Sequence, residues 1–174
     1  MNSSIRLLAI ALTVVSMAAC NKTVKPLPPT ESMPPSDTTA EAQTGTTNDP
    51  WSGTAEEILA NNECLKGRTI RFDLDRTEIS PEFQEMVGCH AKFLAKFSNY
   101  KLSLGGNADE RGTREYNLGL GERRNNAVMD VLKAKGASGS QIEGISYGEE
   151  QPTCTESTES CWANNRRVEF TYSK

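Results

Sequence analysis

Residues 105–126, GGNADERGTREYNLGLGERRNN, constrain the fold of this chain more than any other stretch. Before them, Leu102 and Leu104 alternate with polar residues, which is typical of a half-buried strand. The glycines then break the pattern, and Thr113 is a suitable N-cap for a helix that Gly136 would end. The sequence therefore predicts a strand, a charged glycine-containing loop and a helix in direct succession.

The predicted helix has a recognisable apolar face. We expect this face to carry Tyr116, Leu120, Ala127 and Val131, which recur at helical spacing. An acidic residue, Glu115, falls in the first turn, where it suits the helix dipole.

Elsewhere the pattern predicts one domain over residues 51–174, a normal size for a chain with its own core. Its elements alternate in the order β-α-β-α-β-(short α)-β, which indicates an α+β fold with a mixed sheet covered by helices. The predicted elements are an apolar helical lead-in at Trp51 and Ile58-Leu59, a strand through Ile70, Phe72 and Leu74, a helix from Ser80-Pro81 to Tyr100, a strand at 142–147, and a last strand through Val168, Phe170 and Tyr172.

The first nineteen residues have the features of a targeting signal. Arg6 precedes an apolar run at 7–15, which is shorter than the roughly 20 residues that span a bilayer. Small residues precede Cys20, and the order Met-Ala-Ala-Cys resembles a bacterial lipobox, in which the cysteine is lipidated and becomes the mature N-terminus. A plain secretory signal without lipid is the alternative. We expect residues 1–19 to be a lipoprotein signal peptide and Cys20 to carry the lipid.

Residues 20–50 are predicted to form a disordered tether. They contain six of the eight prolines and many threonines but no aromatic residue, so they cannot bury enough apolar surface to offset the entropy of ordering. Thirty such residues reach about 30 Å as a coil and about 90 Å when extended. An unselected spacer would have the same composition.

Four cysteines remain once Cys20 is assigned to the lipid, an even number that favours disulfides in an exported protein. Three connectivities are possible. We favour Cys64–Cys89 and Cys154–Cys161, because the second pair flanks a short loop and the first can form if the lead-in packs on the first long helix. No C-x-x-C spacing or other metal-ligand pattern occurs, so we predict no metal and no cofactor.

The words NADERGT, EYNLGLGERR, SYGEE and NRRVEF occur in the order and spacing of the OmpA-like peptidoglycan-binding domain. The resemblance covers roughly residues 68–172 and is greatest to the peptidoglycan-associated lipoproteins. It implies the same fold that the periodicity predicts. It also implies non-covalent binding to the diaminopimelate of the peptidoglycan stem peptide, whose side-chain end carries an ammonium and a carboxylate.

By this resemblance, Asp109 binds the ammonium and Arg124 binds the carboxylate, for which a guanidinium is suited by its planar pair of donors. Leu120 lies one turn before Arg124 and would form a wall of the pocket. The remaining predicted contacts are Arg111, Thr113 and Asp75, the last placed at the end of the first strand. The alternative is that Asp109 merely pairs with Arg124 or Arg111 and holds the loop to the helix.

The resemblance further implies a lipid-anchored protein of the outer membrane that faces the periplasm and belongs to the Tol–Pal system, with TolB as a partner and roles in envelope integrity and cell division. Asn21, in place of aspartate after the cysteine, agrees with the outer membrane. The alternatives are an OmpA-family lipoprotein without a Tol partner, a cell-wall enzyme, and a purely structural module.

Catalysis and nucleic-acid binding are not expected. The single histidine, His90, lies within a predicted helix, where a structural role is the ordinary interpretation, and no residue set has catalytic spacing. Arginines near the acids would lower the carboxyl pKa and disfavour general-acid chemistry. A formal charge of −4 leaves no broad basic surface for nucleic acid.

Overall fold

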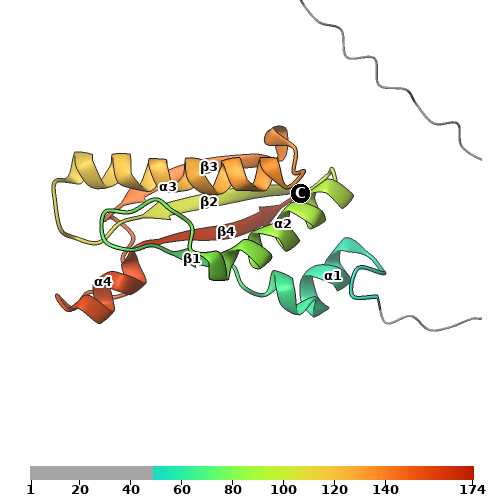
Figure 1. Cartoon of the computed structure of the whole chain (residues 1–174), viewed down its shortest axis with the longest axis horizontal. Coiled ribbons are helices and arrows are strands. Elements are labelled where there is room, and N and C mark those ends of the chain that lie inside the picture. The colour runs from blue at the N-terminus through green and yellow to red at the C-terminus, as the bar shows by residue number, and fades with distance from the viewer. Residues whose placement is uncertain (1–48) are drawn as a thin grey trace, which may run out of the picture. The chain divides into compact units, whose positions relative to one another are not determined.

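The computed structural model describes residues 49–174, so the predicted signal, Cys20 and most of the tether lie outside the described residues. Within that part, the elements follow the predicted order (Figure 1). The α-helices are α1 (Ala55–Asn61), α2 (Gln84–Lys96), α3 (Arg114–Ala134) and α4 (Glu159–Asn165). The strands are β1 (Thr69–Arg71), β2 (Lys101–Asn107), β3 (Ile142–Gly148) and β4 (Arg167–Ser173). Short 3₁₀ turns lie at Glu63–Leu65, Pro81–Phe83 and Gly139–Gln141.

The four described strands form one sheet in the order β1-β4-β2-β3. β2 and β3 are parallel and are connected through α3, whereas β4 lies antiparallel between β1 and β2. The α+β prediction with a mixed sheet is thus confirmed. The sheet face that carries Leu102, Leu104 and Phe170 is buried, and α3 runs along β2 and β3 with α2 beside it (Figure 1).

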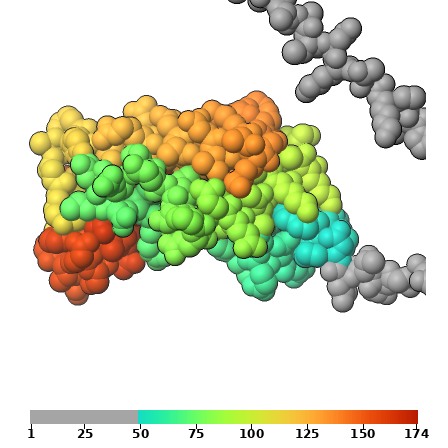
Figure 2. Space-filling model, in the orientation of Figure 1, coloured from blue at the N-terminus to red at the C-terminus, as the bar shows by residue number. Residues whose placement is uncertain are grey.

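The core lies between this sheet face and the helices. It includes Val87, Leu94 and Val128, all fully buried, and an aromatic group in which Phe93 packs edge-on to Tyr172 with ring centroids 5.0 Å apart. A space-filling view shows the closely packed surface of residues 49–174 (Figure 2). No helix in this described part is both long enough and apolar enough to cross a bilayer.

Glycine is required where α3 crosses the sheet. A Cβ on Gly106 would meet the Gly121 carbonyl oxygen, and one on Gly121 would meet the Ser146 hydroxyl, so the helix and β2 approach backbone to backbone. The ends of α3 are as predicted: the Thr113 hydroxyl accepts a bond from the Tyr116 N–H at 3.2 Å, and Gly136 follows the helix with a φ of 101°.

Three expectations about the elements are wrong. The helix predicted to run up to Tyr100 ends at Lys96, and its first residues, Pro81–Phe83, form a 3₁₀ turn. The first strand ends at Arg71 and does not extend through Leu74, which is 55% exposed. The chain leaves the sheet because the carbonyls of Asp73 and Arg76 turn inward to accept bonds from Arg124. Asp75 therefore lies in a turn, with a φ of 56°.

The buried face of α3 is also shifted by one residue from the predicted face. Tyr116 is exposed, and Ala127 and Val131 are only half-buried. Seven residues of the helix are buried, and three of them are polar: Asn117, Arg124 and Asn125. The other four are Leu120, Gly121, Val128 and Leu132. Hydrophobic periodicity misses such a face, because its polar members stay in the interior by donating side-chain hydrogen bonds to main-chain carbonyls.

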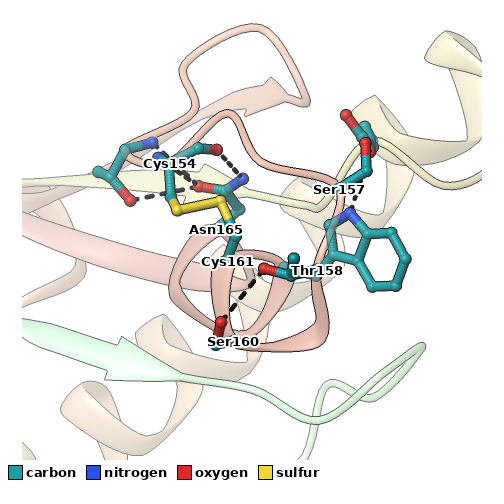
Figure 3. Close-up of a disulfide and its surroundings, with 9 residues drawn as sticks. Cys154, Ser157, Thr158, Ser160, Cys161 and Asn165 are labelled. Carbon is teal, nitrogen blue, oxygen red and sulfur yellow. Dashed lines mark hydrogen bonds between the residues drawn. A yellow bond between two sulfur atoms is a disulfide. The ribbon is translucent and has the colours of Figure 1, made fainter.

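Both predicted disulfides are present, Cys64–Cys89 and Cys154–Cys161, with Cα–Cα distances of 6.0 and 5.2 Å. The first joins the turn after α1 to helix α2, as the packing of the lead-in on this helix required. The second closes a short segment before β4 (Figure 3).

Candidate binding site

A cavity of about 380 Å³ lies where the turn after β1, the loop after β2 and the first half of α3 meet. Five of the six predicted ligand contacts line it: Asp75, Asp109, Arg111, Leu120 and Arg124. Its other lining residues are Leu74, Ala108, Gly112, Tyr116, Asn117 and Arg166. Thr113 is absent from this lining, and its hydroxyl caps α3, so its contact with a ligand stays a prediction.

Arg124 lines the cavity and holds together the chain segments around it. Its side chain is fully buried and donates to three main-chain carbonyls: Nε to Arg76 at 3.0 Å, Nη1 to Asn107 at 2.7 Å and Nη2 to Asp73 at 3.1 Å. A guanidinium has five N–H donors. One N–H on each terminal nitrogen therefore has no hydrogen-bond acceptor within residues 49–174, a pair of donors suited to a carboxylate.

The surroundings of Arg124 combine burial, nearby charges of both signs and an aromatic ring. Burial, and secondarily the charge of Arg166, lower the pKa of Arg124 to about 10, while Asp109 and Asp75 act in the opposite sense. The guanidinium is still charged at neutral pH. It also lies over the Phe72 ring at 5.1 Å. Three arginines against two aspartates give the cavity lining one net positive charge.

Asp109 is the buried acid of the cavity, and each of its two carboxylate oxygens accepts two hydrogen bonds. Oδ1 accepts the Arg111 backbone N–H and side-chain Nε, both at 3.1 Å. Oδ2 accepts Arg111 Nη2 at 2.7 Å and Arg166 Nη1 at 3.2 Å. Burial alone would raise the pKa of Asp109, but these hydrogen bonds outweigh it and hold the pKa below its usual value.

The structure shows which of the two predicted pairings Asp109 makes. No direct bond joins Asp109 to Arg124 among the described contacts; the acid pairs with Arg111 and with Arg166. The two key residues still line one cavity, as the resemblance implied. Arg166 also lines the cavity, and its Nε donates to the Phe72 carbonyl at 3.0 Å.

Sequence reasoning overlooked several lining residues. Tyr116 reads as an apolar helix position, but its hydroxyl bonds to Asp75 across the mouth of the cavity. Asn117 donates to the Asp109 carbonyl at 3.1 Å and so fixes the loop from the helix side. The spacing of Asn117, Leu120 and Arg124 at i, i+3 and i+7 is the one signal that places all three on a common face.

The titratable groups outside the cavity include the single histidine of the chain, His90. The described residues contain no group of three or more His, Cys, Asp or Glu side chains placed to hold a metal ion. His90 lies in the core, with Nε2 2.8 Å from the Gly67 carbonyl and Nδ1 2.8 Å from the Tyr172 hydroxyl. Its role is structural, as predicted.

The fold and this cavity define a class of protein, a domain with a cavity lined by charged residues beside a mixed four-stranded sheet. Comparison with known proteins gives the family. The sequence profile of the OmpA family matches residues 71–166, more than half of the chain, and the chain belongs to this family.

Several relatives of this chain carry the same name, peptidoglycan-associated lipoprotein. The peptidoglycan-associated lipoprotein of Pseudomonas putida is 44% identical over 120 residues, which is 68% of this chain and 72% of the relative. The crystal structure of the peptidoglycan-associated lipoprotein from Burkholderia pseudomallei has a TM-score of 0.63 and 37% identity, and the match covers 64% of this chain and 95% of that one. The C-terminal domain of Helicobacter pylori MotB, at 22% identity and a TM-score of 0.56 over 61% of this chain and 84% of that one, shares the fold alone. The lipoprotein relatives are named for association with peptidoglycan and not for a reaction, in agreement with the prediction that this chain is not an enzyme.

Proposed function

We propose that this chain is a lipoprotein that binds peptidoglycan non-covalently through the diaminopimelate of the stem peptide. The observation that carries the proposal is the Arg124 fork, two unpartnered N–H donors on a buried cation that lines a 380 Å³ cavity beside Asp109. An amino-acid end group with one carboxylate and one ammonium matches this pair of opposite charges. Membership of the OmpA family and the peptidoglycan-associated relatives support the same ligand.

In this proposal each lining residue has a role. Arg124 receives the ligand carboxylate, Asp109 receives the ammonium, and Leu120 packs against the methylene chain between them. Arg111 and Asp75 flank the acid at the cavity mouth, and Thr113 contributes from the start of α3. Recognition is by charge and shape, so no bond in the ligand is broken.

Binding of a stem peptide that contains diaminopimelate, measured by calorimetry, tests this site. Asp109→Asn keeps the size of the side chain but removes its charge, and we expect it to weaken binding about 10- to 100-fold, the effect of losing one charge-assisted hydrogen bond. Asp130→Asn is the matched control, because Asp130 is an exposed residue of α3 paired with Lys133. Equal binding by both variants and the unchanged chain would refute the role of Asp109.

Arg124 needs a different variant, because its removal leaves three inward carbonyls without donors. Arg124→Lys keeps a charge but removes the fork, and we expect weaker binding together with reduced stability. Arg71→Lys, at an exposed position of β1, is the control. Thermal melting of each variant separates loss of binding from loss of folding.

We further propose that Cys20 carries a lipid that anchors the chain in the outer membrane, facing the periplasm, and that the protein acts as the Pal component of a Tol–Pal system with TolB as a partner. The tether at 20–50 would then join the membrane to the cell wall. Cys20→Ser should move the protein from the membrane fraction to the soluble fraction. Retention of that variant in the membrane fraction without detergent would contradict the lipid anchor. If TolB does not co-purify with the protein, the alternative function, an OmpA-family lipoprotein without a Tol partner, is favoured.

A further inference from the structure

The segment 154–162, which contains the Cys154–Cys161 bond and which we call the disulfide loop, lies against the loop that carries Asp109. The Cys154–Cys161 bond closes it, and the Asn165 side chain fixes its start by accepting from the Cys154 N–H at 3.2 Å and donating to the Cys154 carbonyl at 2.7 Å (Figure 3). Ser157, within the loop, donates to the Glu110 carboxylate at 2.7 Å. The disulfide loop is thus tied both to the C-terminal end of α4 and to the loop that carries Asp109.

Two residues at the end of this loop hold Arg111. The Trp162 ring stacks on the Arg111 guanidinium, with 4.1 Å between Cζ and the ring centroid, and the indole N–H donates to Glu110 at 3.0 Å. Glu159 accepts from Arg111 Nη1 at 3.5 Å and from Arg166 Nη2 at 2.8 Å. Arg111 is therefore positioned over Asp109 by side chains that belong to the disulfide-closed segment.

This arrangement leaves Asp109 no position for a ligand cation. An ionised carboxylate offers about four lone-pair sites. All four are in use, three by Arg111 and one by Arg166. An ammonium can bind Asp109 only when one of these donors leaves.

The Arg111 side chain is the donor free to leave. Arg166 is only 7% exposed and also donates to the Phe72 carbonyl, so its departure would leave that buried carbonyl unpaired. Arg111 is 32% exposed and, apart from Asp109, is held by the stack with Trp162 and the long contact with Glu159.

We propose that Arg111 is an internal competitor of the ligand ammonium at Asp109, and that Trp162 and Glu159, presented by the disulfide loop, set the strength of this competition. The inference rests on the proposed function and adds residues outside the cavity that tune its affinity. Ligand binding then includes an exchange step in which one cation replaces another on Asp109. Trp162 and Glu159 are positioning residues, since they act through Arg111.

Two peptides distinguish this role from a merely structural one. One ends in meso-diaminopimelate, and the other ends in 2-aminopimelate, which keeps the side-chain carboxylate but lacks the ammonium. We expect Trp162→Ala and Glu159→Gln to tighten binding of the first peptide, by about three- to tenfold for the lost stack on Trp162. The affinity for the second peptide should not change, because it does not compete with Arg111.

Matched controls come from the same segment. Trp162→Phe keeps an aromatic face for the guanidinium and should bind like the unchanged chain. Glu156→Gln removes an exposed charge of the disulfide loop that makes no side-chain contact with Arg111 in the described structure. The Glu159 side chain is 63% exposed, so Glu159→Gln should fold normally. This variant therefore still tests the competition if Trp162→Ala destabilises the loop.

The outcomes separate the two proposals. Tighter binding confined to the diaminopimelate peptide supports the competition. If the chain binds this peptide and Asp109→Asn weakens binding, but Trp162→Ala and Glu159→Gln bind equally or less well, the competition is refuted and the proposed function stands. If the unchanged chain binds neither peptide at millimolar concentration, both proposals are refuted.

Discussion

Acidification should destabilise this protein well above the pH at which its carboxylates titrate, and His90 is the reason. The imidazole is fully buried, and a carbonyl can only accept, so Nε2 donates to Gly67 and Nδ1 accepts from the Tyr172 hydroxyl. Protonation would put a charge in the core and remove the acceptor for Tyr172. Burial is the main reason that the pKa of His90 is lowered to about 4, with the nearby charge of Arg68 acting in the same direction and the Gly67 bond opposing both.

The direction and size of the change in unfolding free energy with pH follow from the difference between the folded and unfolded pKa values of His90. The unfolded chain has an ordinary histidine pKa near 6.5, so between pH 6.5 and 4 it binds a proton that the folded protein does not. Stability is therefore complete above pH 6.5 and falls as the pH falls. At pH 5.5 the unfolded histidine is about ten-elevenths protonated, which lowers the free energy of unfolding by about 1.4 kcal/mol relative to pH 7.5. By pH 4 the loss reaches about 3 kcal/mol.

Urea unfolding at pH 7.5 and pH 5.5 measures this difference. His90→Gln is the control: the variant starts from lower stability, but its change between the two pH values should be smaller by about 1.4 kcal/mol. Because His90 is the only histidine in the chain, its ring signals in NMR are unambiguous and report its pKa directly.

Either of two results would refute this reasoning. An equal change in unfolding free energy for the unchanged chain and His90→Gln would mean that other groups carry the pH dependence. A ring titration near pH 6.5 in the folded protein would mean that the core tolerates the imidazolium.

The remaining predictions concern the helices and the disulfides. Gly121→Ala should destabilise the fold by about 1–3 kcal/mol, since the new Cβ meets the Ser146 hydroxyl and the Gly106 backbone. Gly88→Ala in α2 should instead stabilise the fold by about 0.5–1 kcal/mol, because alanine favours the helix and its Cβ would come no closer than 3.7 Å to the Lys135 side chain. Thermal melting measures both variants, and a change in melting temperature of the same sign for the two would contradict this account. Reduction of the two disulfides should lower the free energy of unfolding by about 2–4 kcal/mol each, while ligand binding persists. If thiol titration of the unreduced, denatured protein finds four free cysteines besides Cys20, the two bonds are excluded.

The elements that follow from local pattern could be predicted from the sequence. The N-cap at Thr113, the stop at Gly136 and the alternation of β2 and β4 need only nearby residues, and the structure has all of them. The sequence allowed three disulfide pairings and favoured the one that the structure has. The proximity of Asp109 and Arg124 came from the family resemblance, because no spacing rule brings a loop residue beside a helix residue fifteen positions later.

What the sequence could not predict depends on long-range polar contacts. The chain turns out of the sheet after β1 because Arg124 draws in the carbonyls of Asp73 and Arg76 from about fifty residues away. A buried guanidinium reads as a surface residue in any hydrophobicity pattern, which is why the predicted face of α3 was shifted. The stack of Trp162 on Arg111 likewise joins segments with no local signal.

The position of β4 has a consequence for the order of events in the cell. This strand follows β1, β2 and β3 along the chain, yet it occupies the interior of the sheet, with Ile70 of β1 paired to Val168 of β4. Until residues 167–173 have left the ribosome, β1 has no partner and β2 has one open edge. The sheet can therefore close only once this last strand is available, because its interior pairings join segments far apart in the chain.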